Sequence, residues 1–239
     1  MIEKHLMKLR ARDDITADEE RALRDAVGEV IHYPADHTFI TAGRELNHST
    51  LLIEGFLCRY KDLSGGQRQI TEVHVAGDFA DLHSFTLKYL DHNVMALTPS
   101  KIVQVPHEKL AAITEQFPHL ARVLWFATNL DAAIHREWEV SLGRRSALER
   151  TAHLFCELQV RLGVVGLGSE REYALPITQS ELAECLGLTS VHVNRVLREL
   201  RERELVEFRS GRVMIADLAG LKNVAEFDPA YLYLDKRPR

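Results

Sequence analysis

Hydrophobic positions along the chain change their period twice. From Asp18 to Val30 apolar residues recur three and four apart behind Thr16, which predicts a capped helix. From Ile31 to Pro106 short apolar runs alternate with glycine-containing turns, which is typical of a small closed or rolled antiparallel sheet. The strands predicted in this region cover residues 38–40, 50–53, 56–60, 68–73, 94–97 and 101–105. Helical spacing returns after Pro106, so the first half combines a sheet with flanking helices.

A long helix is predicted from Pro118, because proline suits the first helical position. Apolar residues then alternate at steps of four and three, a heptad seam that is imperfect at Asp131. Such a seam predicts self-association, and packing against the chain's own sheet is the alternative that stays open. The seam residues are Leu120, Leu124, Ala127, Ile134 and Trp138. Gly143 is expected to end the helix and to provide a hinge.

Two short helices joined by a glycine turn are predicted between Ile177 and the start of a hairpin. Thr178 and Glu181 have the spacing of a capping box, Gly187 makes the turn, and Thr189 caps the second helix. The apolar residues of that second helix face inward at helical spacing. The side chains left on its outer face are Ser190, Val191, His192, Asn194, Arg195 and Arg198. This arrangement is typical of a helix-turn-helix whose second helix enters the major groove of DNA.

A β-hairpin is predicted directly after the second helix. Residues 205–208 and 213–215 alternate around a Ser210–Gly211 turn, and Arg209 and Arg212 flank that turn, where they could meet phosphates. The residues expected to contact DNA are therefore Thr178, Thr189, Ser190, Val191, Asn194, Arg195, Arg198, Arg209 and Arg212.

Length, charge and composition exclude some classes of protein function. The 239 residues favour two domains, and a net charge of −5 argues against indiscriminate nucleic-acid binding. From Arg144 to Arg212 there are eleven Arg, no Lys and ten Glu, a net charge of +1 that leaves −6 on the rest. Cys58, Cys156 and Cys185 form no CxxC pair and are read as core residues. No apolar run reaches the ~18 residues of a membrane span, and residues 1–14 lack a signal-peptide core, so we expect a cytoplasmic protein without a membrane role.

The order of these elements resembles the Crp/Fnr superfamily of bacterial transcription regulators, from about Thr16 to Ala216. The most specific part runs from Glu181 to Leu200, where Gly187, Val193, Arg195 and Leu197 match the family's pattern. Turn glycines of the family's β-roll are matched by Gly43, Gly55 and the Gly77–Asp78–Phe79 triplet.

The resemblance implies an α+β fold with a β-roll of the cyclic-nucleotide-binding type, a long dimerisation helix and a C-terminal winged helix-turn-helix. The expected boundaries are 1–117 for the roll with its flanking helices, 118–143 for the dimerisation helix and hinge, 144–217 for the DNA-binding domain and 218–239 for a C-terminal extension. The extension is too apolar for a free tail and is expected to pack on its own chain or on a partner subunit. The implied partners are double-stranded DNA at a pseudo-palindromic operator, a second copy of the chain and RNA polymerase.

The resemblance makes Ser190, Val191, Asn194 and Arg195 the base-reading residues. Arginine can contact guanine O6 and N7 in a bidentate manner. Well-known members place a glutamate where this chain has Val191, and a valine can offer only apolar contact to a thymine methyl. A changed base preference opposite Val191 is therefore expected.

The region that resembles the family's effector pocket departs from its cyclic-nucleotide binders. Leu82 stands at the apparent position of the ribose-binding glutamate, no arginine occurs between Arg68 and Arg122, and Asp81 would bring negative charge near a phosphate. Control by cyclic AMP is not expected, and no cofactor is predicted; any small-molecule effector stays unknown. The candidate pocket residues are Asp81, Leu82, His83, His92, His135 and Arg136.

Four other functions differ in the residues or the behaviour that they require. A haem- or metal-dependent sensor stays open because of the twelve histidines, although their spacing matches no compact ligand pair. The oxygen-sensing type needs a cysteine cluster before the roll, which is missing here. An enzyme is not expected, because there is no His-x-His pair, nucleophile signature or phosphate-binding glycine loop. A protein-interaction adaptor would differ from a DNA binder in lacking strongly salt-dependent DNA affinity.

Overall fold

The computed structural model describes residues 1–237, which form two compact units. Unit 1 comprises Met1–Lys61, Val73–Ala133 and the tail from Tyr233; unit 2 comprises Asp62–Glu72 and Ile134–Leu232. Helix α5 (Pro118–Arg144) contributes its first part to unit 1 and its second part to unit 2. The predicted boundaries at residues 117 and 143 therefore differ from the observed division, because this helix packs with a different unit at each end.

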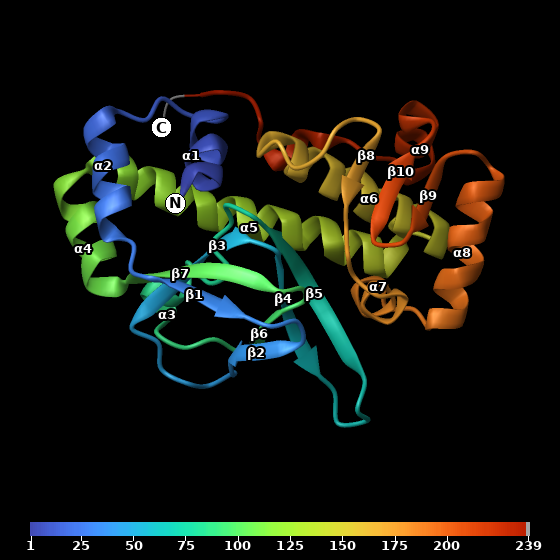
Figure 1. The fold of residues 1–239 in the computed structure, drawn as a ribbon, viewed down its shortest axis with the longest axis horizontal. Coiled ribbons are helices and arrows are strands. Elements are labelled where there is room, and N and C mark those ends of the chain that lie inside the picture. Colours follow the sequence, from blue (N-terminus) through green and yellow to red (C-terminus); the bar gives the residue numbers. More distant parts are fainter. Residues whose placement is uncertain (238–239) are drawn as a thin grey trace. The chain divides into compact units, whose positions relative to one another are not determined.

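Seven strands make the two sheets of the β-roll, with orders β1-β7-β3 and β2-β6-β4-β5 (Figure 1). Their bounds are β1 Val30–Tyr33, β2 His37–Ile40, β3 His48–Glu54, β4 Phe56–Asp62, β5 Arg68–Val75, β6 Asn93–Ala96 and β7 Ser100–Pro106. All six predicted strands are confirmed, and all the registered pairings are antiparallel. The alternating pattern was sufficient here because each strand buries one face in the roll.

Strand β1 was not among the predicted strands, and its first residue, Val30, was placed at the end of a predicted helix. Helix α2 (Ala17–Ala26) instead ends where Val27 adopts an extended conformation, and the Gly28 amide donates to the Gln104 carbonyl of β7 at 2.9 Å. The apolar residues that follow pair with β7 rather than continuing the helix. The Thr16 cap is confirmed and belongs to a full capping box with Glu19.

Helices cover one side of the roll. Leu51 and Val103 from the strands share a core with Leu23 of α2, Leu110 of α4 (His107–Gln116) and Leu120 of α5. A short helix, α3 (Ser84–Leu87), follows the Gly77–Asp78 turn and packs beside β3. The apolar stripes of these helices are therefore buried against the sheet, as amphipathic helices require.

Helix α1 (Glu3–Arg10) was not predicted, and it docks on the Gly77–Asp78 turn. His5 Nδ1 donates to the Gly77 carbonyl at 3.0 Å, and the Lys8 ammonium pairs with the Asp78 carboxylate. Gly77 has φ +91°, and a Cβ there would lie 2.7 Å from the Lys4 carbonyl carbon. A glycine is required both for the backbone conformation and for the close approach of α1.

Three buried histidines make the stability of the fold depend on pH. Burial lowers the pKa of His5 and of His107 to about 4 and that of His153 to about 3, from an ordinary 6.5. Below pH 6.5 the unfolded chain protonates these rings while the folded chain keeps them neutral, so stability is expected to fall as the pH drops from 6.5 towards 4. Asp81 opposes this trend, because burial raises its pKa to about 7. Thermal unfolding midpoints recorded between pH 7.5 and pH 4 measure the net slope.

A substitution at His5 tests the contribution of one of these histidines to the pH dependence of stability. His5→Gln keeps a donor for the Gly77 carbonyl but cannot titrate, so it should flatten the loss of stability between pH 6.5 and pH 4. His32→Gln is the matched control, because His32 is exposed on β1. Equal pH slopes for both variants and the parent protein would contradict the prediction.

Unit 2 surrounds helix α6 (Ala147–Val164). Its other elements are β8 Glu172–Ala174, α7 Gln179–Leu186, α8 Ser190–Glu202, β9 Val206–Arg209, β10 Arg212–Ile215, α9 Leu218–Ala225 and a 3-10 turn, η1, at Pro229–Leu232. The three strands form a sheet of order β8-β10-β9. Gly143 does not end α5 as predicted: the helix continues to Arg144, and the break comes before Ser146, which caps α6 together with Glu149. A single glycine in a helix costs only about 1 kcal/mol, whereas a capping box specifies a new start.

Among residues 1–237, no helix is both long enough and apolar enough to span a bilayer.

Candidate nucleic-acid interface

The helix-turn-helix is built by local signals that the sequence displays. The Thr178 hydroxyl accepts from the Glu181 amide at 3.1 Å, and the Glu181 carboxylate accepts from the Thr178 amide at 2.5 Å. Gly187 ends α7 with φ +61°, and Thr189 accepts from the His192 amide at 3.3 Å to begin α8. Thr178 and Thr189, which were expected to contact DNA, thus have capping roles in the structure.

Helix α8 is divided between a buried and an exposed face. Val193, Val196 and Leu200 are buried, as predicted, and hold the helix on the unit. Exposed side chains occupy the other face, and Val191 is 77 % exposed. The predicted base-reading residues Ser190, Val191, Asn194 and Arg195 all lie on this exposed face together with Arg198. A protruding helix with a valine and two arginines on its surface can enter a major groove and offer both apolar and bidentate contacts.

Two surface hollows lie beside α8. One is lined by Val191, Asn194, Arg195 and Arg198. The other is lined by Gln179, Asn194, Leu197, Arg198, Arg201, Glu207 and Phe208. Asn194 and Arg198 line both, so they occupy the ridge between the hollows. Gln179 and Arg201 were missed by the sequence analysis; Gln179 directly follows the Thr178 cap, a position from which a helix N-terminus commonly meets a phosphate.

The wing is the β9–β10 hairpin. Ser210 and Gly211 both have positive φ, 52° and 71°, which is the conformation of a tight two-residue hairpin turn. Arg209 and Arg212 are exposed on either side of it, as expected. The Arg212 guanidinium also lies 3.0 Å from the Glu172 carboxylate of β8, an exposed ion pair that DNA phosphate can compete with at small cost.

The six candidate effector-pocket residues are divided between the two units. Asp81, Leu82, His83 and His92 belong to unit 1, whereas His135 and Arg136 belong to unit 2. Asp81 is completely buried, and its carboxylate accepts from the amide and the hydroxyl of Thr50. It therefore fastens the loop before α3 to β3. Leu82 is buried in the core of unit 1.

A polar cluster inside unit 1 was missed. The buried Arg59 of β4 donates to the Ala80 carbonyl at 2.7 Å and to the Asp131 carboxylate of α5 at 2.8 Å. His83 Nδ1 lies 4.0 Å from the same carboxylate, and the His83 and His92 rings are 5.5 Å apart. An arginine in an otherwise apolar run of β4, and the aspartate that interrupts the heptad seam, were the signals that could have revealed it.

Most residues of the predicted dimer seam are buried within the chain itself. Leu120 and Leu124 are buried in the core of unit 1, and Ala127 packs against that core. Ile134 and Trp138 are buried as well, 5 % and 7 % exposed. The alternative left open by the sequence, packing against the chain's own sheet, accounts for Leu120, Leu124 and Ala127, which lie in or against the core of unit 1. Self-association along the seam stays a prediction.

A different face of α5 is exposed. Arg122, Trp125, Asn129 and Ala132 recur at steps of three, four and three, and all four are exposed. Trp125 is 70 % exposed. A tryptophan on the outer face of a helix is the kind of residue that anchors protein interfaces.

Comparison with known proteins agrees with this architecture. Residues 149–224 match the model of the Crp-like helix-turn-helix domain, and residues 30–117 match that of the cyclic nucleotide-binding domain. The chain is 26 % identical to the fumarate and nitrate reduction regulatory protein of Vibrio cholerae, over 77 % of this chain and 73 % of the relative. It is also 26 % identical to the transcriptional activator protein FnrL of Cereibacter sphaeroides, over 88 % of this chain and 86 % of the relative.

A solved structure shows the same fold. The structure of FixK2 from Bradyrhizobium japonicum superposes with a TM-score of 0.75 at 24 % identity, covering 82 % of this chain and 96 % of that one. The sensor-type roll, the long helix and the winged helix-turn-helix occur in the order that the sequence predicted. The chain belongs to the Crp/Fnr family of DNA-binding transcription regulators.

Proposed function

We propose that this regulator binds a pseudo-palindromic operator as a homodimer, with one α8 in each of two successive major grooves. The observation that carries the proposal is the exposed face of α8, where Val191, Asn194 and Arg195 line one hollow. A two-fold dimer places its recognition helices about 34 Å apart, one turn of DNA. The protein acts without a catalytic role, in the cytoplasm where bacterial DNA lies, and contacts RNA polymerase, as membership of the family suggests.

We propose that the dimer forms through the exposed face of α5 that carries Trp125. Of the residues first expected to form the contact, Leu120, Leu124, Ile134 and Trp138 are buried within the chain and Ala127 is half-buried. Arg122, Asn129 and Ala132 continue the exposed face at heptad-like spacing. The small Ala132 side chain would let two helices approach closely, and Trp125 would supply the apolar anchor.

We propose further that cyclic AMP is not the effector. Leu82 offers no hydrogen bond to a ribose, and its side chain is committed to the core of unit 1. The buried Arg59, an arginine in the roll that could attract a phosphate, is paired with the Asp131 carboxylate. Binding an anion there would require breaking a buried ion pair, which typically costs several kcal/mol.

Selection of operators from random DNA tests the readout by Val191. The selected half-site should carry an A·T pair opposite Val191, because its exposed methyl groups can contact a thymine methyl but cannot hydrogen-bond. Val191→Glu should change the preference to C·G by about tenfold, because a carboxylate accepts from cytosine N4. Selection with and without cyclic AMP should return the same half-site with the same enrichment.

The matched control is Met214→Glu, which adds the same charge to an exposed position of the wing strand β10. It should weaken binding to all sequences alike without changing the selected base. A parent protein that selects C·G opposite Val191, or selects only in the presence of cyclic AMP, would contradict the respective proposal. Failure to enrich any paired half-sites would contradict operator binding itself.

A further inference from the structure

The chain continues beyond the wing and returns to α6. Asp217 caps α9, and Leu221 and Ala225 are buried where α9 packs on α6. Phe227 and Leu232 are buried in the segment that follows. The helix-turn-helix family model matches only to residue 224, so residues 225–232 are an addition to that domain. The sequence left open whether the extension at 218–239 covers its own chain or a partner; its residues up to Leu232 belong to unit 2, and Tyr233 belongs to unit 1.

The extension supplies a donor to a buried carboxylate. Glu157 of α6 is completely buried, and Arg161 on the same helix pairs with it at 2.9 Å. Trp138 Nε1 on α5 donates to both of its oxygens at 3.2 Å. The Tyr231 hydroxyl donates to Oε2 at 2.9 Å. One carboxylate thus joins α5, α6 and the extension, and a buried charge that loses a donor is strongly destabilised.

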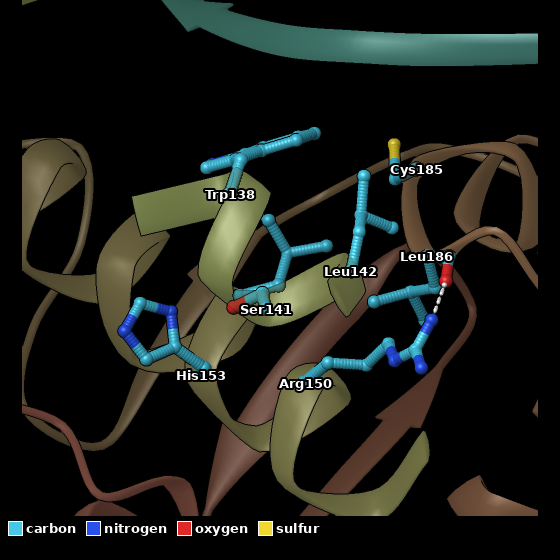
Figure 2. A pocket seen from close by; sticks show the side chains of 8 residues that line it. Trp138, Ser141, Leu142, Arg150, His153, Cys185 and Leu186 are labelled. Carbon is cyan, nitrogen blue, oxygen red and sulfur yellow. Dashed lines mark hydrogen bonds between the residues drawn. The ribbon is translucent and has the colours of Figure 1, made fainter. Parts of the chain in front are cut away.

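Aromatic rings of the extension also pack on α6, close to this carboxylate. The His153 ring of α6 lies 5.1 Å from the Phe227 ring and stacks with the Tyr231 ring at 5.9 Å. Figure 2 shows Trp138 of α5 and His153 of α6 among the residues that line one pocket, together with residues of α7. The extension therefore covers the α5–α6 junction with two rings in addition to one hydrogen bond.

Polar contacts connect this junction to the end of α7, the helix before the recognition helix. The Arg145 guanidinium, at the break between α5 and α6, pairs with Glu137 of α5 at 2.6 Å. Arg150 of α6 donates to the Arg145 carbonyl at 3.0 Å and to the Leu186 carbonyl, at the end of α7, at 2.8 Å (Figure 2). Any change in the angle between α5 and α6 would therefore move α7 and the α8 that follows it.

We propose that the extension is part of the DNA-reading apparatus and that Tyr231 is a positioning residue, which acts through Glu157 to fix α5 against α6 and so sets the separation of the two recognition helices. The inference rests on the proposed dimeric operator binding. Without the Tyr231 hydroxyl the junction samples several angles, and only a fraction of molecules presents both α8 helices at the spacing of the operator. Apparent affinity falls in proportion to that fraction.

Operators with altered spacing between half-sites test whether the separation of the two recognition helices is fixed. One base pair added between half-sites separates them by about 3.4 Å and rotates them by about a tenth of a turn. The parent protein should lose about tenfold or more in affinity on the lengthened operator. Tyr231→Phe should bind the original operator about tenfold more weakly and the lengthened one with a penalty of less than about threefold.

Tyr173→Phe is the matched control. The Tyr173 hydroxyl also donates to α6, to the Phe155 carbonyl at 2.9 Å, and it is buried in the same unit, but this hydrogen bond involves neither α5 nor the Glu157 carboxylate. Both variants should lower the thermal unfolding midpoint, whereas only Tyr231→Phe should lose discrimination between spacings. If both variants discriminated equally well between the original and the lengthened operator, Tyr231 would have only a structural role, and the inference would be overturned.

Trp138→Phe provides a second route, because it removes the donor that α5 gives to the same carboxylate. It should also lose the discrimination between the original and the lengthened operator. If Tyr231→Phe does not fold, the result for Trp138→Phe tests the inference instead. Full discrimination in Trp138→Phe would overturn the inference. Failure of the parent protein to bind either operator would instead refute the proposed operator binding, so the two failures are distinguishable.

Discussion

Replacement of Arg195 by alanine is expected to abolish sequence-specific DNA binding while leaving the fold intact. Arg195 is exposed on α8, where its guanidinium can contact guanine O6 and N7. One such contact contributes about 1–3 kcal/mol of discrimination, and a dimer makes two. The combined loss corresponds to roughly 30-fold to 10⁴-fold in affinity for the selected operator. Titration of labelled operator DNA measures it, with unchanged thermal unfolding as evidence that the fold is retained.

Two control variants distinguish recognition of a base by Arg195 from the general attraction of a positive charge to DNA. Arg195→Lys keeps the positive charge but loses the bidentate geometry, so it should discriminate nearly as poorly as the alanine variant. Arg209→Ala removes an exposed wing arginine; it should weaken binding to all sequences alike and reduce the dependence on salt by about one phosphate contact per protomer. If Arg195→Ala still distinguished the selected operator from one with the guanine replaced, Arg195 would not read that base.

Replacement of Trp125 by glutamate is expected to dissociate the dimer. The side chain is 70 % exposed in the isolated chain, so the substitution removes little internal packing. Burying a tryptophan at an interface is typically worth 2 kcal/mol or more, and two-fold symmetry counts it twice. We therefore expect the dimer dissociation constant to rise by at least about 10³-fold and operator affinity to fall with it. Sedimentation equilibrium and DNA titration measure the two effects.

Tyr89→Glu is the control for Trp125, because Tyr89 is another exposed aromatic residue, 59 % exposed, and lies outside α5. It should leave both the dimer and DNA binding unchanged. A Trp125→Glu protein that remained dimeric at the same concentrations would place the contact elsewhere on the chain.

The DNA-reading helices were predicted well because their signals are local. A capping box places donor and acceptor three residues apart, and the positive φ of Gly187 lets the chain end α7 and turn into α8. The inward residues of α8 repeat at the period of the helix itself. Such interactions form between neighbours in the chain, so the order of residues specifies them almost completely. The strands of the roll were predicted for a similar reason, since alternation is a property of each strand.

The long helix shows where sequence patterns become ambiguous. A heptad seam fits a partner helix and the chain's own core equally well, because both require an apolar stripe. Leu120 and Leu124 are buried in unit 1, whereas Trp125 on another face of the helix is exposed. Gly143 was similarly ambiguous, and the capped start of α6 at Ser146 determined where the helices separate.

The sequence by itself determined the order of elements, the recognition helix with its unusual Val191, and membership of the family by resemblance. Only the tertiary structure decided which face of α5 is exposed, that Arg59 pairs with Asp131, and that Tyr231 reaches Glu157. These contacts join residues 72 and 74 positions apart. A side chain's partner at such distances depends on how whole elements pack, and no local period or spacing records that packing.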